Sequence, residues 1–317
     1  MGSEDPQIAV AIVSWNTRDF LERCLRSLRP DLESGLIEVW VVDNDSHDGS
    51  ADMVREGFPW AKLIESGANL GFGRAVNLAA AHTNTPWLVP ANADIEMHPG
   101  TLRTLLEAGE RHPRTGIVAP RMLRPEGDTE HSVHPFPSAA TFALAALTPQ
   151  LFGRALADRL CLYGSWDPER EREVPWAVGA FLLVRREAWN AVGGFPDGQW
   201  MYAEDLDLGW SVAERGWTTR YVPSARITHV GGASAHQAFG TKAIERWMDA
   251  TYAWVARRRG RPRAAALGAA AITAGAVRFA VLSVACLFDQ DRFLRRRDRT
   301  KGWITMHMRG LRATLGC

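Results

Sequence analysis

Amide, hydroxyl and carboxylate side chains gather at five points of this 317-residue chain, four of them directly after a short apolar run. These groups are Ser14-Trp15-Asn16, Asp43-Asn44-Asp45, Gly67-Ala68-Asn69, Asn92-Ala93-Asp94 and Glu204-Asp205. Carboxylate and amide oxygens are ligands for hard divalent cations, and a carboxylate can also take a proton from a hydroxyl group. The residue types therefore favour a site that combines ligand binding with proton transfer.

The elements that must position these groups are short apolar runs that alternate with helical patterns. We expect strands at Ile8–Ser14, Ile37–Val42, Lys62–Ile64 and Trp87–Val89, and helices at Asp19–Leu28, Gly49–Glu56 and Gly71–Ala81. This alternation is typical of βαβ units on a mainly parallel sheet. Because such sheets bind ligands beyond the carboxyl ends of their strands, the four strand-end groups predict one common site.

The middle of the chain is less regular. Residues 124–175 are rich in Pro, His and Ala and indicate an insertion or a mobile loop over the sheet. Order returns at Val178–Arg185, after which Glu204 to Asp207 open a predicted helix. Two further strands are expected at Thr218–Val222 and Ala225–His229.

The last quarter changes character. A helix is expected at Thr241–Trp254, and an apolar run at Ala264–Phe288 is bordered by two arginine-rich segments. This run is long enough to cross a bilayer, but it is rich in alanine and carries Arg278 near its middle. We favour helices that lie on, or partly sink into, an anionic cytoplasmic leaflet; an ordinary buried helix beside solvated arginines is the alternative.

Composition excludes several classes of protein. The net charge of +1 argues against a dedicated nucleic-acid binder, so no nucleic acid is expected as a partner. The four cysteines form no CxxC pair, which fits a reducing cytoplasm better than a disulfide framework. The polar N-terminus leads directly into an apolar strand without a signal-peptide pattern, so we expect a cytoplasmic location.

Together the motifs resemble family 2 glycosyltransferases of the GT-A fold. Five motifs occur in the family's order: Val13-Ser14-Trp15-Asn16, the run from Val42 to Ser50, the run from Gly67 to Gly73, Asn92-Ala93-Asp94 and Ala203-Glu204-Asp205. The likeness is closest to the bacterial rhamnosyltransferase-like branch. It implies a Rossmann-like α/β/α sandwich at residues 1–235, with a nucleotide-sugar-binding half at 8–123 and an acceptor and catalytic half at 124–235. Residues 236–317 would form a helical extension that could associate with a membrane.

The resemblance implies a donor site at the strand ends. Asp43 would accept the imide N–H of uracil or thymine, although Asp43, Asp45 or Ser46 could instead cap the next helix, a role that suits Asp45 or Ser46 better. Gly71 would let the backbone approach the ligand while Arg74 reaches a phosphate; a tight turn with a surface arginine is the alternative. The full donor-binding set is Ser14, Asn16, Asp43, Asn44, Asn69, Gly71, Arg74, Asn77, Asn92 and Asp94.

The resemblance also implies a metal site. Most GT-A enzymes carry an Asp-any-Asp motif where this chain has Asn92 and Asp94. Because an amide is the weaker ligand, Asp94 is the firm candidate, and Asn92 could contact the donor or simply form a turn. His229 corresponds to a metal-binding histidine of relatives, though a lone histidine is often structural. The expected cofactor is Mn²⁺ or Mg²⁺.

On the acceptor side, the resemblance implies that Asp205 is the general base and that Glu204 binds or orients the acceptor. The alternative is that acids in the first turn of a helix only complement its dipole, which accounts well for Asp207. Trp176, Gly179 and Trp200 are further acceptor-binding candidates; core packing is the competing interpretation for the tryptophans.

These expectations combine into one function. The resemblance implies an inverting, metal-dependent transfer of a sugar, foremost rhamnose from dTDP-rhamnose, onto a polyprenol-linked saccharide in cell-wall or surface-polysaccharide synthesis, at the inner face of the plasma membrane. A UDP-sugar-dependent hexosyl or galactofuranosyl transferase and a catalytically inactive scaffold are alternatives. Nucleotidyl transfer is disfavoured because the first strand is followed by Ser14-Trp15-Asn16-Thr17 and not by a glycine-rich loop.

Overall fold

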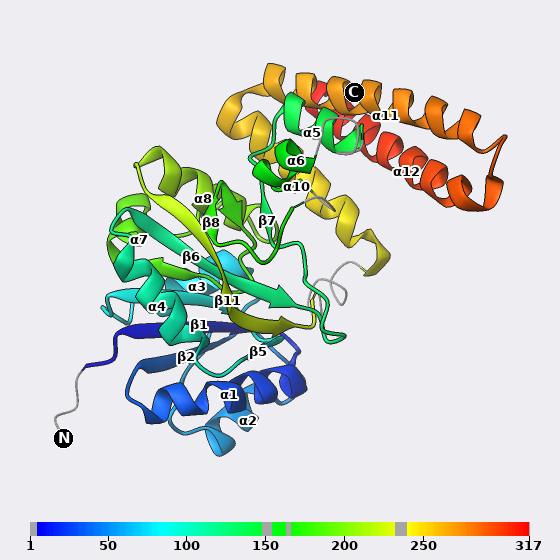
Figure 1. Ribbon diagram of the computed structural model, residues 1–317. Coiled ribbons are helices and arrows are strands. Elements are labelled where there is room, and N and C mark those ends of the chain that lie inside the picture. The colour runs from blue at the N-terminus through cyan, green and yellow to red at the C-terminus, as the bar shows by residue number, and fades with distance from the viewer. Residues whose placement is uncertain (1–4, 148–153, 163–165, 232–239, 317) are drawn as a thin grey trace. The chain divides into compact units, whose positions relative to one another are not determined.

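The computed structural model describes residues 5–147, 154–162, 166–231 and 240–316 (Figure 1). The chain forms two compact units: Met1–Val133 with Pro168–Gly240, and His134–Asp167 with Thr241–Cys317. This division differs from the boundaries expected from the sequence, because residues 134–167 were placed with the catalytic half and belong instead to the unit of the C-terminal helices.

The first unit is built on one nine-stranded sheet with the order β3-β2-β1-β4-β10-β6-β11-β5, in which β8 also pairs with β11. Its strands are β1 (Ile8–Ser14), β2 (Ile37–Asp43), β3 (Lys62–Glu65), β4 (Trp87–Asn92), β5 (Ile95–Met97), β6 (Thr115–Leu123), β8 (Arg172–Val174), β10 (Leu183–Arg185) and β11 (Thr218–His229). The first four pair in parallel, which confirms the predicted βαβ units. Strands β10, β8 and β5 add antiparallel pairs.

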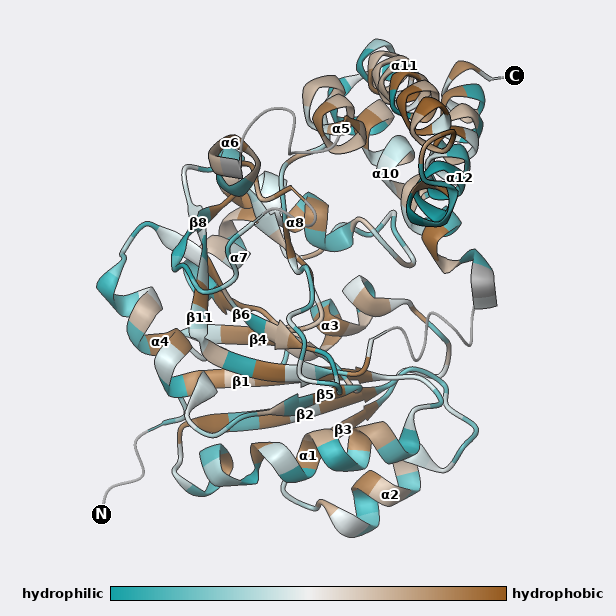
Figure 2. Cartoon of the chain, turned by 45° about the vertical axis from the view of Figure 1, so that its right-hand side comes forward, coloured by the Kyte–Doolittle hydropathy of each residue, from teal (hydrophilic) through white to brown (hydrophobic). Residues whose placement is uncertain are grey.

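Helices cover both faces of this sheet (Figures 1 and 2). They are α1 (Arg18–Glu33), α2 (Ser50–Gly57) and α4 (Thr101–Arg111) on one face, and α3 (Phe72–Ala80), α7 (Arg186–Val192) and α8 (Glu204–Glu214) on the other. Alternate residues of β1, such as Val10 and Ile12, share one core cluster with Leu21 and Leu25 of α1. This period-two burial on two covered faces is the reason that β1 is apolar throughout.

Strand register brings the polar strand ends to one edge. Ser14 lies opposite Asp43 on β2, and Val13 lies opposite Asn92 on β4. The two strands predicted at 218–222 and 225–229 form the single strand β11, with a register irregularity between Val222 and Arg226. Its end runs antiparallel to β5, so His229 also reaches this edge. The predicted gathering of polar groups at the sheet edge is therefore confirmed.

Helices make up most of the second unit. They are α5 (Ala139–Ala146), α6 (Arg154–Arg159), α10 (Ala243–Arg259), α11 (Arg261–Ala285) and α12 (Gln290–Leu315), with a 3-10 turn at Gly240–Lys242 before α10. The sequence predicted α10 and α11 but no helix after residue 288. Residues 124–175, expected as an insertion or mobile loop, hold α5, α6 and β8, and the short strand β7 (Val133–His134) pairs with β9 (Trp176–Ala177).

Helices α11 and α12 form an antiparallel hairpin in which glycines of α11 face α12. A side chain at Gly268 would meet Leu311, and one at Gly275 would meet Ile304, so the two helices run in opposite directions at close range. The ring of Tyr252 occupies the space over Gly310, and its hydroxyl lies 2.9 Å from Nδ1 of the buried His307. Small residues at these contacts let the helix backbones approach closely.

Candidate active site

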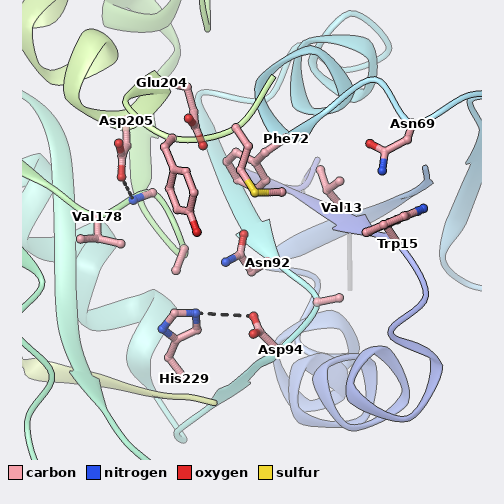
Figure 3. Close-up of a pocket in the computed structure, with 15 residues that line it drawn as sticks. Val13, Trp15, Asn69, Phe72, Asn92, Asp94, Val178, Glu204, Asp205 and His229 are labelled. Atoms are coloured by element: carbon pink, nitrogen blue, oxygen red, sulfur yellow. Dashed lines mark hydrogen bonds and ion pairs between the residues drawn. The ribbon is translucent and has the colours of Figure 1, made fainter. Parts of the chain in front are cut away.

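A pocket of the first unit opens at the polar edge of the sheet (Figure 3). Seven of the residues predicted from the sequence line it: Asn69, Asn92, Asp94, Gly179, Glu204, Asp205 and His229. In the view of Figure 3, Glu204 and Asp205 lie on one side, Asp94 and His229 lie on the other, and Asn92 stands between them. Trp15 and Phe72 also line the pocket, although the sequence analysis gave them no role, and so does Tyr202, which precedes the acidic pair.

Asp94 and His229 meet because of strand pairing. Residue 94 lies just before β5, residue 229 ends β11, and the Val230 N–H donates to the Asp94 carbonyl at 3.0 Å. This pairing holds the buried His229 Nε2 3.5 Å from Asp94 Oδ1. Burial alone would lower the pKa of His229, but hydrogen bonds to Asp94 and Glu130 and the charges of both acids outweigh it and raise the pKa to about 9.

Glu130 is a site residue that the sequence analysis missed. Its Oε2 lies 2.8 Å from His229 Nδ1, on the ring nitrogen that faces away from Asp94. A carboxylate that accepts the Nδ1–H fixes the imidazole tautomer with Nε2 directed at a metal, which is the usual arrangement behind a metal-binding histidine. Ninety-nine residues separate the two side chains in sequence, so no local pattern could have found the pair.

The Asp94–His229 pair has the chemistry of a partial metal site. A carboxylate oxygen and a buried ring nitrogen that face each other are an acceptable donor set for Mn²⁺, and less natural for Mg²⁺ because of the nitrogen. Among the residues that the structure describes, no further His, Cys, Asp or Glu completes a cluster of three ligands. A cation held here would take its other ligands from a bound substrate or from water.

The acidic pair stands at the start of α8 as predicted. Asp205 accepts the Gly179 N–H at 2.9 Å and the Leu206 N–H at 2.8 Å, whereas Glu204 Oε2 is buried without a hydrogen-bond partner. Tyr202 and Ala203, which precede the pair, both have positive φ angles of 71° and 63°. Such left-handed backbone is uncommon for residues other than glycine and marks a segment held under strain.

Burial separates the titration of the two acids. Desolvation, followed by the charge of Asp205, raises the pKa of Glu204 from its ordinary value of 4.5 to about 8. Desolvation also raises the pKa of Asp205, but the N–H groups of Gly179 and Leu206 oppose the shift by stabilising its ionised form. When the pair holds a single proton, the two N–H groups therefore favour the charge on Asp205 and the proton on Glu204.

Asp43, at the end of β2, keeps one carboxylate oxygen without a hydrogen-bond partner. Its Oδ2 accepts the Ser46 N–H at 3.0 Å, while the buried Oδ1 has no hydrogen-bond partner. A buried acceptor without a donor is costly unless a ligand supplies one. The sequence-based alternative that Asp45 or Ser46 caps α2 is wrong, because Asp48 accepts the N–H and hydroxyl of Ser50 at the helix start.

Other predicted donor residues build the loops of this edge. The Asn44 side chain accepts the Leu70 N–H and donates to Asn69 and to the Gly71 carbonyl. Ser14 pairs with Thr17, and Asn16 accepts the His47 N–H. Gly71 has φ +78°, and a Cβ there would lie 2.1 Å from the Trp200 carbonyl oxygen, so this position requires glycine. These contacts support the loops from within.

Four further predicted residues lie outside the lining of the pocket, as do Ser14, Asn16, Asp43, Asn44 and Gly71. Asn77 uses its side chain to bind the backbone of Phe195, and Arg74 is exposed on α3. Trp176 is 3% exposed and packs against Gly209 of α8, so stacking on an acceptor sugar is sterically excluded and the core-packing alternative holds. Trp200 is 41% exposed and donates from Nε1 to the Asn69 carbonyl at 3.2 Å, beside the pocket.

Solved structures share this architecture and show the fold. A mannosyltransferase from Pyrobaculum calidifontis in complex with GDP-Man and Mn²⁺ superposes with a TM-score of 0.62 at 20% identity, covering 98% of this chain and 86% of that one. TarS 1–349 from S. aureus in complex with UDP gives a TM-score of 0.51 at 14% identity, covering 83% and 70%. The fold is that of a GT-A glycosyltransferase, as the sequence analysis expected.

The chain belongs to glycosyl transferase family 2. The family model matches residues 9–188, and a model described as glycosyl transferase family group 2 matches residues 151–288. N-acetylglucosaminyl-diphospho-decaprenol L-rhamnosyltransferase of Mycobacterium tuberculosis is 34% identical over 233 residues, covering 70% of this chain and 75% of the relative. Rhamnosyltransferase WbbL of Escherichia coli is 25% identical, covering 80% and 94%. The protein is a rhamnosyltransferase-like glycosyltransferase.

The raised pKa of Glu204 makes stability depend on pH. Because the folded-state pKa lies above the unfolded value, the contribution of Glu204 is fully present below about pH 4.5 and is lost as the pH rises through about 8. Glu204→Gln replaces the carboxyl group with a neutral amide, so the variant does not pay the cost of burying a charged carboxylate at high pH. We expect the melting temperature of the ligand-free variant to exceed that of the wild type by several degrees near pH 9, and the excess to vanish near pH 5.

Calorimetric melting temperatures across this range would test the expectation. The exposed Glu126 provides the control, since Glu126→Gln changes the same group in a turn outside the pocket. A difference between wild type and Glu204→Gln that stays constant with pH would contradict the assignment.

Proposed function

We propose that this glycosyltransferase transfers L-rhamnose from dTDP-rhamnose, with inversion, onto a saccharide carried by polyprenol diphosphate. The observation that carries the proposal is the acidic pair facing Asp94 and His229 within one pocket. The M. tuberculosis relative, whose name specifies rhamnosyl transfer to N-acetylglucosaminyl-diphospho-decaprenol, supports both the sugar and the class of acceptor. WbbL, also a rhamnosyltransferase, supports the sugar.

Inversion follows from a single displacement. The acceptor oxygen forms a bond to the anomeric carbon, the bond from that carbon to the diphosphate breaks, and its electron pair leaves with the nucleotide. Asp205 takes the acceptor's proton, because its ionised form is stabilised by two backbone N–H groups. Protonated Glu204 can donate a hydrogen bond that orients the acceptor or the sugar ring.

Asp94 and His229 would hold a divalent cation, with Mn²⁺ favoured by the ring nitrogen. When bound there, the cation would offset the negative charge that develops on the departing diphosphate. Glu130 keeps His229 in the tautomer and orientation that such a ligand needs. Because His229 carries a proton at neutral pH in the ligand-free protein, binding of the cation at Nε2 would release it.

Asp43 would set the preference of the donor site for particular nucleobases. Its Oδ1, which has no hydrogen-bond partner, can accept the imide N–H of uracil or thymine. Cytosine and adenine have no such N–H group. Uracil and thymine share this group, so Asp43 alone does not separate a dTDP-sugar from a UDP-sugar. A UDP-sugar-dependent hexosyl or galactofuranosyl transfer is therefore the second candidate.

The proposed location is the cytoplasm, with the protein peripheral on the inner face of the plasma membrane. Helix α11 is long and apolar enough to cross a bilayer by length and composition, and arginines flank it. A saccharide on a polyprenol carrier is confined to the membrane surface, where such a region would bring the enzyme.

Donor identity can be measured directly. Purified protein with Mn²⁺ and a synthetic N-acetylglucosaminyl-diphospho-prenol is incubated separately with dTDP-rhamnose, UDP-glucose, UDP-galactofuranose and GDP-mannose. We expect transfer from dTDP-rhamnose at a rate well above the others, with product of inverted anomeric configuration by NMR. Preferred transfer from a UDP-sugar would replace the donor assignment, and no transfer from any donor would favour the inactive scaffold.

The base assignment predicts an order among two isosteric variants. Asp205→Asn should lower kcat by about 10²–10⁴-fold, the usual effect of losing a general base. Glu204→Gln should retain far more activity, because the amide resembles the protonated acid that the wild type already carries. Rates are measured at saturating donor, with circular dichroism to verify folding. The reverse order would assign the base to Glu204.

If the enzyme depends on a metal, substitutions of Glu130 should weaken Mn²⁺ binding to different degrees. EDTA should abolish transfer and Mn²⁺ should restore it, if Asp94 and His229 hold the ion. Glu130→Ala should weaken Mn²⁺ binding, measured by calorimetry, by about 10–100-fold, and Glu130→Gln by less because its amide oxygen can still accept the Nδ1–H. The matched control Glu126→Ala alters an exposed glutamate of the same segment. Activity that survives EDTA would refute the metal site.

A further inference from the structure

The outward face of the second half of α11 is apolar. Its exposed positions recur at a spacing of three and four residues and continue into the following turn: Ala276, Val277, Ala280, Val281, Val284, Leu287 and Phe288, here called the apolar stripe. Val281 is 63% exposed and Phe288 is 86% exposed. A surface helix normally carries polar residues at such positions. The large apolar side chains concentrated here therefore indicate an interaction surface.

The opposite face of α11 already has its partners. Leu267, Ala271 and Ala274 are buried in the second unit, where α11 packs against α5, α10 and α12. The helix is thus apolar on both faces, as its brown colour in Figure 2 shows. Burial within the second unit accounts for one face only, so the ordinary buried helix considered from the sequence does not explain the apolar stripe.

Arginines at the start of α12 lie beside the apolar stripe. The contacts of Gly268 with Leu311 and of Gly275 with Ile304 set the antiparallel register, in which residues near 296 lie level with residues near 282. Four arginines in this part of α12 are exposed: Arg292, Arg295, Arg296 and Arg299. An apolar face next to a basic one is the pattern of a helix that binds at the surface of an anionic membrane.

Two contacts argue against α11 crossing the bilayer. Arg278 donates to the Ala146 carbonyl at the end of α5, so a spanning α11 would carry this arginine and α5 with it. Helix α12 packs along α11 and holds Arg295, Arg296 and Asp298 beside its second half. Placing these charges in hydrocarbon would be costly, whereas a helix parallel to the surface leaves them in water or at the headgroups.

We propose that the apolar stripe docks on an anionic lipid leaflet, with α11 parallel to the bilayer, Leu287 and Phe288 sunk to the acyl boundary, and the α12 arginines on lipid phosphates. The proposal deepens the proposed function, since a polyprenol-linked acceptor lies in such a leaflet. Charge favours lipid over a second copy of this chain. A symmetric dimer through the stripe would bring the arginines of both copies close together, where like charges repel.

Vesicle co-sedimentation of the full chain tests the proposal. We expect binding to vesicles of phosphatidylglycerol mixed with phosphatidylcholine, much weaker binding to phosphatidylcholine alone, and release by salt. The double variant Leu287→Ser, Phe288→Ser should weaken binding by about tenfold or more, because both side chains are over 80% exposed and contribute by insertion. Ile244→Ser is the matched control: this side chain is 69% exposed on α10, outside the stripe, and should change nothing.

A second pair of variants tests the basic face. Arg295→Gln and Arg296→Gln should each weaken binding to the anionic vesicles by about fivefold, the effect of about 1 kcal/mol per arginine near a charged surface. Arg111→Gln, an exposed arginine on α4, serves as the control and should leave binding unchanged. Equal loss in the control would mean that net charge, and not this surface, drives binding.

Three outcomes would overturn the proposal. They are stripe variants that bind vesicles like the wild type, a wild-type dimer that the stripe variants convert to a monomer, and resistance to alkaline carbonate extraction, which would indicate a spanning helix.

Measuring sugar transfer to a water-soluble acceptor fragment separates membrane docking from the enzyme's activity. Stripe variants should retain that transfer in full, whereas a wild-type protein that binds vesicles but transfers no sugar would refute the proposed function alone.

Discussion

The pairing of β11 with β5 is the constraint on which the site depends. β5 has only three residues and follows Asp94 directly, so its hydrogen bonds to the end of β11 fix where His229 can lie. Strand β11 also pairs with β6 in parallel and with β8 in an antiparallel direction. A ligand to a cation is therefore held by the most connected strand of this half of the sheet, and a shift in its register would separate His229 from Asp94.

Desolvation organises the other side of the pocket. Glu204 and Asp205 are adjacent in sequence and share one buried environment, yet Asp205 accepts the N–H groups of Gly179 and Leu206, whereas Glu204 Oε2 has no hydrogen-bond partner. The difference comes from Gly179, whose position after β9 brings its N–H to the start of α8. Packing thus favours the charge on Asp205 and the proton on Glu204 when the pair holds one proton, which is how a fold can supply a base and a hydrogen-bond donor from adjacent carboxyl groups.

The sequence was sufficient wherever chemistry and secondary structure are both local. Polar residues after apolar runs marked the strand ends, and parallel pairing then required Ser14, Asp43 and Asn92 to share an edge. Glu130 could not be found in this way, because it approaches His229 from an irregular segment distant in sequence. The prediction that Trp176 stacks on an acceptor sugar was wrong for a related reason. Its proximity in sequence to Gly179 does not show which face of β9 the indole occupies. Helix α5 could not be predicted because its partner, α11, lies more than a hundred residues later.

Tyr202 and Ala203 lead directly into the acidic pair in a left-handed conformation that glycine would adopt without strain. This conformation lowers the stability of the fold by about 1–3 kcal/mol for each such residue, and it presents the acids at a fixed angle. Variants that place glycine at these positions would relieve this backbone strain while loosening the alignment that turnover needs. Selection for activity and selection for stability therefore pull this short segment in opposite directions.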